Sequence, residues 1–114
     1  MRLSGQAVLL RVFVGEEDMC GHKPLYEQVV LKARELNIAG ATVTRGIMSY
    51  GGTSRLHTAK VLRLSEDLPV VIELVDTEEK LQPLLAWLDE HVKTGLVTME
   101  KVNVITYRHA PPAQ

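Results

Sequence analysis

The chain contains few of the residues that most directly reveal a function. It has one cysteine, Cys20, and its aromatic residues are one Phe, one Trp and three Tyr. A single cysteine excludes a disulfide within the chain and fits a reducing compartment. The formal charge of −1 gives no basic surface for DNA or RNA, and so few aromatic rings offer little for base stacking. We therefore expect no nucleic-acid partner.

Long apolar runs are also missing. No stretch approaches the roughly 20 residues of a membrane-spanning helix, and the N-terminus lacks the basic region, apolar core and cleavage site of a secretion signal. We therefore expect a cytoplasmic protein that does not cross a membrane. Apolar residues make up 46% of the 114 residues and charged residues 24%. This balance is typical of one folded domain, here residues 1–114.

Apolar periodicity predicts four strands and two helices. The predicted strands are 6–14, 41–48, 70–75 and 96–107, and the predicted helices run from Pro24 to Asn37 and from Asp76 to Lys93. The order strand–helix–strand occurs twice, which is typical of an α+β ferredoxin-like fold, the split βαβ arrangement. We therefore expect a four-stranded antiparallel sheet with two helices on one face.

Local signals refine the second half of the chain. Asp76, with Glu79 three residues later, predicts a capping box at the start of the second helix. Pro83 inside this helix predicts a kink or a delayed start of the regular part. In the last strand the apolar phase shifts between Met99 and Val102, which predicts a bulge or bend.

Two segments carry no strong periodicity. Segment 50–68 is mostly polar, with a possible short strand at 60–64, and it exceeds the ~12–15 residues above which a loop is usually functional or disordered. A flexible partner-binding loop and an extended β-hairpin arm are both consistent with it. Residues 110–114 are predicted to be a frayed tail.

Both faces of the predicted sheet are rich in apolar residues. In the first strand Val8, Leu10, Val12 and Val14 alternate with Ala7, Leu9 and Phe13, and in the third Val70, Ile72 and Leu74 alternate with Val71 and Val75. Two helices can cover only one face of such a sheet. The second face can be buried only against another subunit, so we expect an oligomer.

The most informative stretch is Gly40–Gly52. It begins as an alternating strand and ends with Gly46, Gly51 and Gly52, which let the backbone approach a partner closely, and His57 follows. Such a strand and glycine-rich end can present backbone amides to an anionic ligand. The same glycines fit a plain hairpin end, so the stretch alone leaves both interpretations open.

Charged and titratable residues near this stretch have alternative roles. Arg45 faces either a ligand cleft or an acidic partner across the sheet, Glu73 or Glu100, and the ion pair is the favoured interpretation. His57 either contacts a phosphate or acts as a switch near neutral pH. A solvated loop histidine is the simpler interpretation of His57.

The pattern Gly40–Val43, followed by Arg45–Gly46, Gly51–Gly52 and His57, resembles the PII signalling superfamily. In that superfamily a Gly-x-Thr-Val strand leads into a long loop that contacts a partner. The chain is more similar still to a PII-like family of bacterial and archaeal proteins of unknown function. The stretches that carry this resemblance, in the family's order, are Gly21–Tyr26, Ala39–Val43 with Arg45–Ile47, Leu68–Val71 and Gly95–Thr98.

This resemblance implies a trimer that binds an adenine nucleotide in clefts between subunits. It also implies that segment 50–68 acts on a partner, commonly a transporter or an enzyme. The implied ligand-binding residues are Arg45, Gly46, Ser49, Tyr50, Gly51, Gly52, His57, Gly95, Thr98 and Arg108. PII proteins carry a Gly-Asp-Gly-Lys turn for phosphates where this chain has Gly95–Thr98, so AMP or ADP is expected rather than ATP.

Two further function classes are weighed against this one. The cysteine and histidines lack the spacing of a zinc site, so we expect no built-in metal, and a metal-responsive trimer is an alternative. A ligand-independent interaction protein is another. No Gly-x-Ser-x-Gly or Walker sequence is present, and we expect a non-enzymatic protein without a built-in cofactor.

Overall fold

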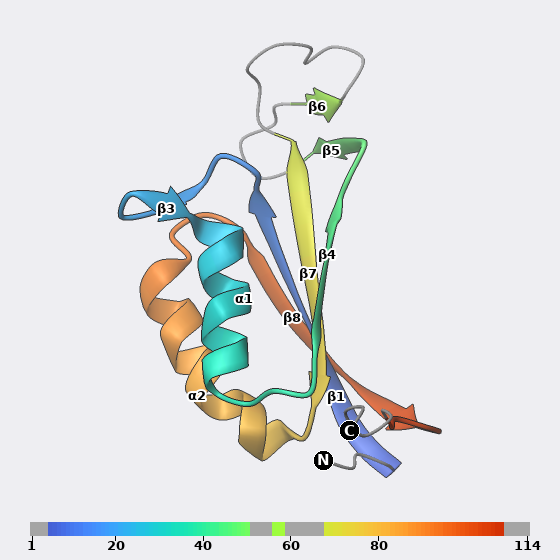
Figure 1. Ribbon diagram of the computed structural model, residues 1–114. Coiled ribbons are helices and arrows are strands. Elements are labelled where there is room, and N and C mark those ends of the chain that lie inside the picture. Colours follow the sequence, from blue (N-terminus) through green and yellow to red (C-terminus); the bar gives the residue numbers. More distant parts are fainter. Residues whose placement is uncertain (1–4, 51–55, 59–67, 109–114) are drawn as a thin grey trace, which may run out of the picture.

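The structure is a computed structural model that describes residues 5–50, 56–58 and 68–108 (Figure 1). Its elements in chain order are β1 (Gly5–Gly15), β2 (Met19–Cys20), β3 (Lys23–Pro24), α1 (Leu25–Glu35), β4 (Ala41–Arg45), β5 (Met48–Tyr50), β6 (Leu56–Thr58), β7 (Pro69–Asp76), α2 (Glu78–His91) and β8 (Leu96–Val104). The predicted strand at 60–64 and the tail at 110–114 lie outside the described residues.

The main sheet is antiparallel and has the strand order β4–β7–β1–β8. Both helices lie on the same face of it, as Figure 1 shows. This arrangement confirms the predicted α+β fold with a four-stranded antiparallel sheet and two helices. β2 pairs with β3, and β5 pairs with β6, in two small additional sheets.

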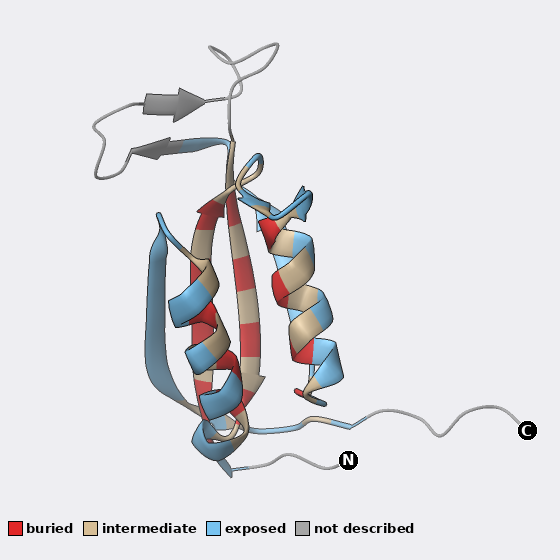
Figure 2. Cartoon of the chain, turned by 90° about the vertical axis from the view of Figure 1, so that its left-hand side faces the viewer, coloured by how far each residue is buried: buried red, intermediate tan, exposed pale blue. Residues whose placement is uncertain are grey.

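The core lies between the helices and the two central strands. β1 and β7 bury every second side chain on the helix face, and the helices contribute residues at helical spacing (Figure 2). The core residues are Val8, Leu10, Val12, Val14, Leu25, Val29, Ala33, Ile38, Val70, Ile72, Leu74, Leu81, Leu84 and Leu88. Full burial of a Leu or Ile side chain contributes about 1.5–3 kcal/mol, so this layer holds the helices on the sheet.

The start of α2 differs from the predicted capping box by one residue. Thr77 is the N-cap, and its side chain accepts a hydrogen bond from the Lys80 amide at 3.3 Å. Asp76 ends β7 on the buried face and is 0% exposed. Its carboxylate accepts from the Thr77 amide at 2.7 Å and from the Ala39 amide at 2.9 Å. Asp76 therefore joins the β7–α2 and α1–β4 turns.

Of the two features predicted for the last strand, a bulge or a bend, the bulge is wrong for the described strand and the bend stays a prediction. The pairing of β1 with β8 is continuous from Gly5↔Val104 to Phe13↔Leu96, with no extra residue on either strand. β8 is an edge strand that is exposed on both faces over most of its length. Its apolar pattern therefore does not need to follow one buried face, and the strand ends at Val104 rather than Tyr107.

Two other boundaries also differ from the prediction. β4 ends at Arg45, so the predicted strand 41–48 is divided, and Met48 belongs to the separate β5. Gly46 still donates its amide to the Pro69 carbonyl at 2.8 Å, which extends the contact between β4 and β7 by one residue. Pro83 lies inside α2 on an exposed position, and the kink stays a prediction.

The sheet face opposite the helices is only half-buried. Its apolar residues include Leu9, Phe13, Val71 and Val75, as predicted. Arg11 interrupts them, because its guanidinium donates to Glu73 on β7 at 2.8 Å and to Glu100 on β8 at 2.7 Å. The hydrogen bond to Glu73 and, to a smaller extent, the one to Glu100 raise the pKa of Arg11 above its ordinary value. The guanidinium is therefore charged at neutral pH. This open face is therefore apolar with a charged centre.

Neither helix in the described part of the chain is both long and apolar enough to cross a membrane.

The role of Asp76 can be tested by stability measurements. Asp76→Ala leaves the amides of Ala39 and Thr77 without their acceptor in a buried place, and we expect it to lower the free energy of unfolding by about 2–4 kcal/mol. Glu79→Ala, at the exposed position of the predicted capping box, should change it by less than ~0.5 kcal/mol. Urea unfolding at equal protein concentrations measures both, and equal losses would contradict the assignment of Asp76.

Candidate functional site

Several predicted ligand residues lie where β4 and β7 meet, at the end of the sheet that leads into segment 50–68. Gly46 follows β4, and its amide donates to Pro69. A Cβ at Gly46 would lie 2.8 Å from the Pro69 Cγ, so a larger residue would force the two strands apart. Gly46 therefore allows this close approach of β4 and β7.

Arg45 forms an ion pair there, although not with either predicted partner. Its guanidinium donates to the carboxylate of Glu16, which follows β1. Arg45 is paired in register with Val70, and Val70 is buried on the helix face. Paired residues point to the same face of a sheet, whereas Glu73 is on the open face. The predicted ion pair with Glu73 or Glu100 is therefore wrong.

The next group of predicted residues belongs to the β5–β6 hairpin. Ser49 is paired with His57, and Tyr50 with Leu56. The pairing thus brings the backbones of three predicted residues together. Gly51 and Gly52 lie outside the described residues.

Gly95 lies at the same end of the sheet but on its opposite edge, and Thr98 lies on that edge three residues further along the chain, towards the middle of the sheet. Gly95 has φ +152°, and a Cβ there would lie 2.5 Å from the Phe13 carbonyl oxygen. Thr98 is paired with Arg11 across β1 and β8. The two edge strands are three strand spacings apart, or roughly 14 Å. In one chain, Gly95 and Thr98 therefore do not meet Arg45.

Arg108 lies at the other end of the sheet. β8 runs away from Gly95 for nine residues, roughly 26 Å, and Arg108 follows it in an exposed position. The preceding residue, Tyr107, donates its hydroxyl to the Ala39 carbonyl at 2.7 Å. This bond holds the segment after β8 against the α1–β4 turn.

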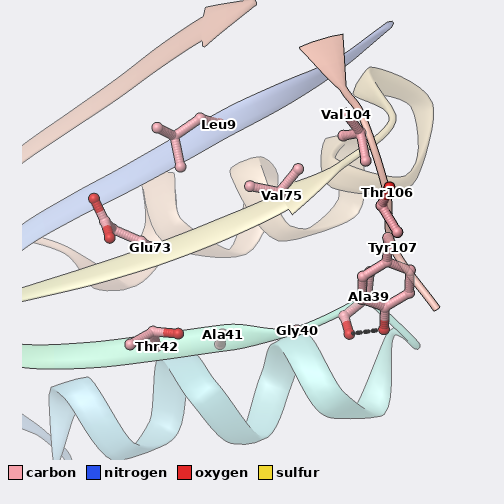
Figure 3. Close-up of a pocket in the computed structure, with 10 residues that line it drawn as sticks. All are labelled: Leu9, Ala39, Gly40, Ala41, Thr42, Glu73, Val75, Val104, Thr106 and Tyr107. Atoms are coloured by element: carbon pink, nitrogen blue, oxygen red, sulfur yellow. Dashed lines mark hydrogen bonds between the residues drawn. The ribbon is translucent and has the colours of Figure 1, made fainter. Parts of the chain in front are cut away.

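Beside that bond is a cavity of about 500 Å³, which sequence reasoning did not predict (Figure 3). It lies on the open face between the α1–β4 turn, β1, β7 and the segment after β8. Its lining residues are Leu9, Ala39, Gly40, Ala41, Thr42, Glu73, Val75, Val104, Thr106 and Tyr107. The charged lining residue is Glu73, a carboxylate, so the cavity does not favour a phosphate. Gly40–Thr42 belong to the motif singled out from the sequence, but at the opposite end from Gly46.

Metal binding finds no support in the described side chains. Among the residues whose side chains the structure describes, 5–48 and 68–108, no three of type His, Cys, Asp or Glu gather as they would around a metal ion. His91 instead stacks on Trp87, with ring centres 4.1 Å apart, and its Nδ1 lies 2.8 Å from the Trp87 carbonyl oxygen.

Comparison with known proteins identifies the family. Residues 7–104 match the family model DUF190, described as an uncharacterised ACR. The chain belongs to the DUF190 family. A UPF0166 protein of Aquifex aeolicus is 40% identical to this DUF190 chain over 100 residues, which cover 85% of the chain and 91% of the relative.

Solved structures show the fold of this DUF190 chain to be PII-like. CPII, a nitrogen regulatory PII-like protein from Thiomonas intermedia K12, was solved bound to ADP, AMP and bicarbonate. It is similar with a TM-score of 0.63 and 17% identity, over 87% of this chain and 88% of CPII. A PII-like protein from Thermus thermophilus is also similar, with a TM-score of 0.63 and 19% identity, over 89% and 91% of the two chains. The PII-like resemblance stated from the sequence is therefore confirmed.

The close approach at Gly95 has a measurable consequence. Gly95→Ala forces a Cβ against the Phe13 carbonyl in a backbone conformation that side chains disfavour, and we expect a loss of about 1–3 kcal/mol in the free energy of unfolding. At Gly40 a Cβ would meet nothing within 4 Å. Gly40→Ala is thus the matched control, with an expected change below ~0.5 kcal/mol. Chemical denaturation measures the free energy of unfolding of both variants. If Gly95→Ala unfolds with the same free energy as wild type, the close contact between Gly95 and Phe13 does not require glycine.

Proposed function

We propose that this DUF190 chain is a non-enzymatic, trimeric PII-like regulatory protein that binds an adenine nucleotide between subunits. The carrying observation is that predicted ligand residues lie on both edges of one sheet, and that Arg45, Gly46 and Gly95 are at the same end of it. Arg45 and Gly46 follow the β4 edge, and Gly95 and Thr98 lie on the β8 edge. A site between copies would unite them, since in one chain the two edges are roughly 14 Å apart. Arg108 lies at the other end of the sheet, so its part in such a site would also require a second copy.

The nature of the open face supports assembly. Its half-buried apolar residues include Leu9, Phe13, Val71 and Val75, and Leu96 on β8 is 55% exposed. Burial of such a surface against other copies stabilises an oligomer. Because Arg11 is already paired with Glu73 and Glu100, the charged centre of this face could enter an interface without leaving the guanidinium unpaired.

The proposed ligand is ADP or AMP. CPII, which shares the fold, was solved with both nucleotides, and this supports an adenine ligand. Arg45, which is exposed at the end of β4, supplies a cation for a phosphate. The absence of a Gly-Asp-Gly-Lys turn at Gly95–Thr98 disfavours the triphosphate. Binding would alter segment 50–68, through which the protein acts on a partner, a transporter or an enzyme, in the cytoplasm.

Calorimetric titration tests the ligand. We expect ADP and AMP to bind wild-type protein more tightly than ATP, and Arg45→Gln to weaken ADP binding about tenfold because a charge-assisted hydrogen bond to phosphate is lost. Arg34→Gln removes an exposed arginine of α1 and should leave the affinity unchanged. No heat with any of the three nucleotides at millimolar concentration would overturn the nucleotide proposal.

Light scattering tests the assembly. A trimer has a mass of about 38 kDa, three times the 12.7 kDa of one chain. Val71→Arg places a charge on the open face and should reduce the mass towards that of one chain, since an unpaired charge is costly in an interface. Leu31→Arg, on α1 where the side chain is 52% exposed, should not change it. A wild-type monomer at micromolar concentration would refute the trimer.

A further inference from the structure

Glu16 contacts the ends of two paired strands, β4 and β7. Its backbone amide donates to the Leu68 carbonyl at 2.7 Å, immediately before β7. Its carboxylate accepts from the guanidinium of Arg45, the last residue of β4. The Arg45 side chain is 61% exposed, whereas that of Glu16 is 28% exposed. The acid is therefore the better-shielded member of the pair, and the arginine is the member that solvent and ligands can reach.

The turn that carries Glu16 is fixed by its own hydrogen bonds. The Gly15 amide donates to the Asp18 carboxylate at 2.9 Å, and the Asp18 amide donates to the Gly15 carbonyl at 3.2 Å. The Asp18 carbonyl in turn accepts from the Leu25 amide at 2.8 Å, which connects the turn to the start of α1. The Glu16 carboxylate is thus held next to Arg45 by an ordered backbone.

We propose that Glu16 is an internal competitor for Arg45, which an anionic ligand must displace. This inference rests on the proposed function, because it assumes that a ligand phosphate uses Arg45. A phosphate and the Glu16 carboxylate would both accept from one guanidinium, and their like charges repel each other. Glu16 therefore weakens the binding of any anion that uses Arg45.

The Glu16–Arg45 ion pair is weak enough to lower the affinity for an anion without preventing its binding. Ion pairs between solvent-exposed side chains are weak, and their loss is readily offset by a new charged partner. Displacement leaves the backbone bond between Glu16 and Leu68 intact, so β7 keeps its connection to the turn. The end of β4 loses its side-chain connection. Ligand binding thus removes the side-chain contact of Glu16 with β4 and keeps its backbone contact with the start of β7, while β4 and β7 stay paired with each other.

The test compares Glu16→Gln with wild-type protein in titrations with ADP and with adenosine. Removal of the competitor should raise the ADP affinity roughly two- to fivefold, the range that a surface ion pair covers, and the gain should shrink at high salt. Adenosine has no phosphate, so its affinity should stay the same. Glu35→Gln breaks the exposed Lys32–Glu35 pair elsewhere on the chain and is the matched control, with no expected change.

Arg45→Gln supplies a second arm. In this background Glu16→Gln should have no further effect on ADP affinity, because the competed group is gone. An unchanged or lower ADP affinity of Glu16→Gln would overturn the inference. An equal rise for ADP and adenosine would also overturn it, since Glu16 would then act through the fold.

Inorganic pyrophosphate separates this inference from the proposed function. Its binding is followed by the amide NMR signal of Gly46, next to Arg45. If wild-type protein binds no ADP, but pyrophosphate shifts Gly46 at lower concentration in Glu16→Gln than in wild type, the nucleotide function fails and the competitor stands. If pyrophosphate shifts Gly46 in neither protein and ADP binds neither, both are overturned.

Discussion

Two helices cover only the central strands of this sheet, and the other features of the structure follow from that constraint. β1 and β7 bury alternate residues beneath α1 and α2, whereas β4 is exposed throughout and β8 over most of its length. In the sheet formed by the described residues, β4 and β8 are also the edge strands, and each has one side that no neighbouring strand of that sheet pairs with. For this reason the surfaces available for assembly and for ligands lie at the edges and on the open face.

The sequence was sufficient to predict those helices and strands whose apolar residues recur at the same spacing as their buried positions. β1, β7 and the apolar sides of α1 and α2 could be predicted because each faces one core. β8 could not be predicted in detail, since an exposed edge strand does not constrain which residues are apolar, and its phase change between Met99 and Val102 mimicked a bulge. The role of Asp76 depends on the amide of Ala39, 37 residues away, which no local pattern encodes.

The candidate site shows the same limit. The glycines were recognisable through the family resemblance, although the contacts that require glycine at Gly46 and Gly95 come from Pro69 and Phe13, which are distant in the sequence. The partner of Arg45 was not, because the choice between Glu16 and Glu73 depends on which face of β4 the arginine occupies. That face is fixed by the pairing of Arg45 with Val70, a register between strands separated by the whole of segment 50–68. The family resemblance was therefore enough to identify the candidate residues, but the strand register was needed to find the partner of Arg45.

The backbone of Ala39 has a consequence for how the chain can vary in length. Its amide is bound by Asp76 and its carbonyl by Tyr107, while seven residues later the amide of Gly46 is bound by Pro69. One inserted or deleted residue between these anchors would break one of them, or would turn Thr42 and Val43 to the wrong faces of the sheet. We therefore expect relatives to have no insertions or deletions between Ala39 and Gly46, because the number of residues between these two anchors is constrained.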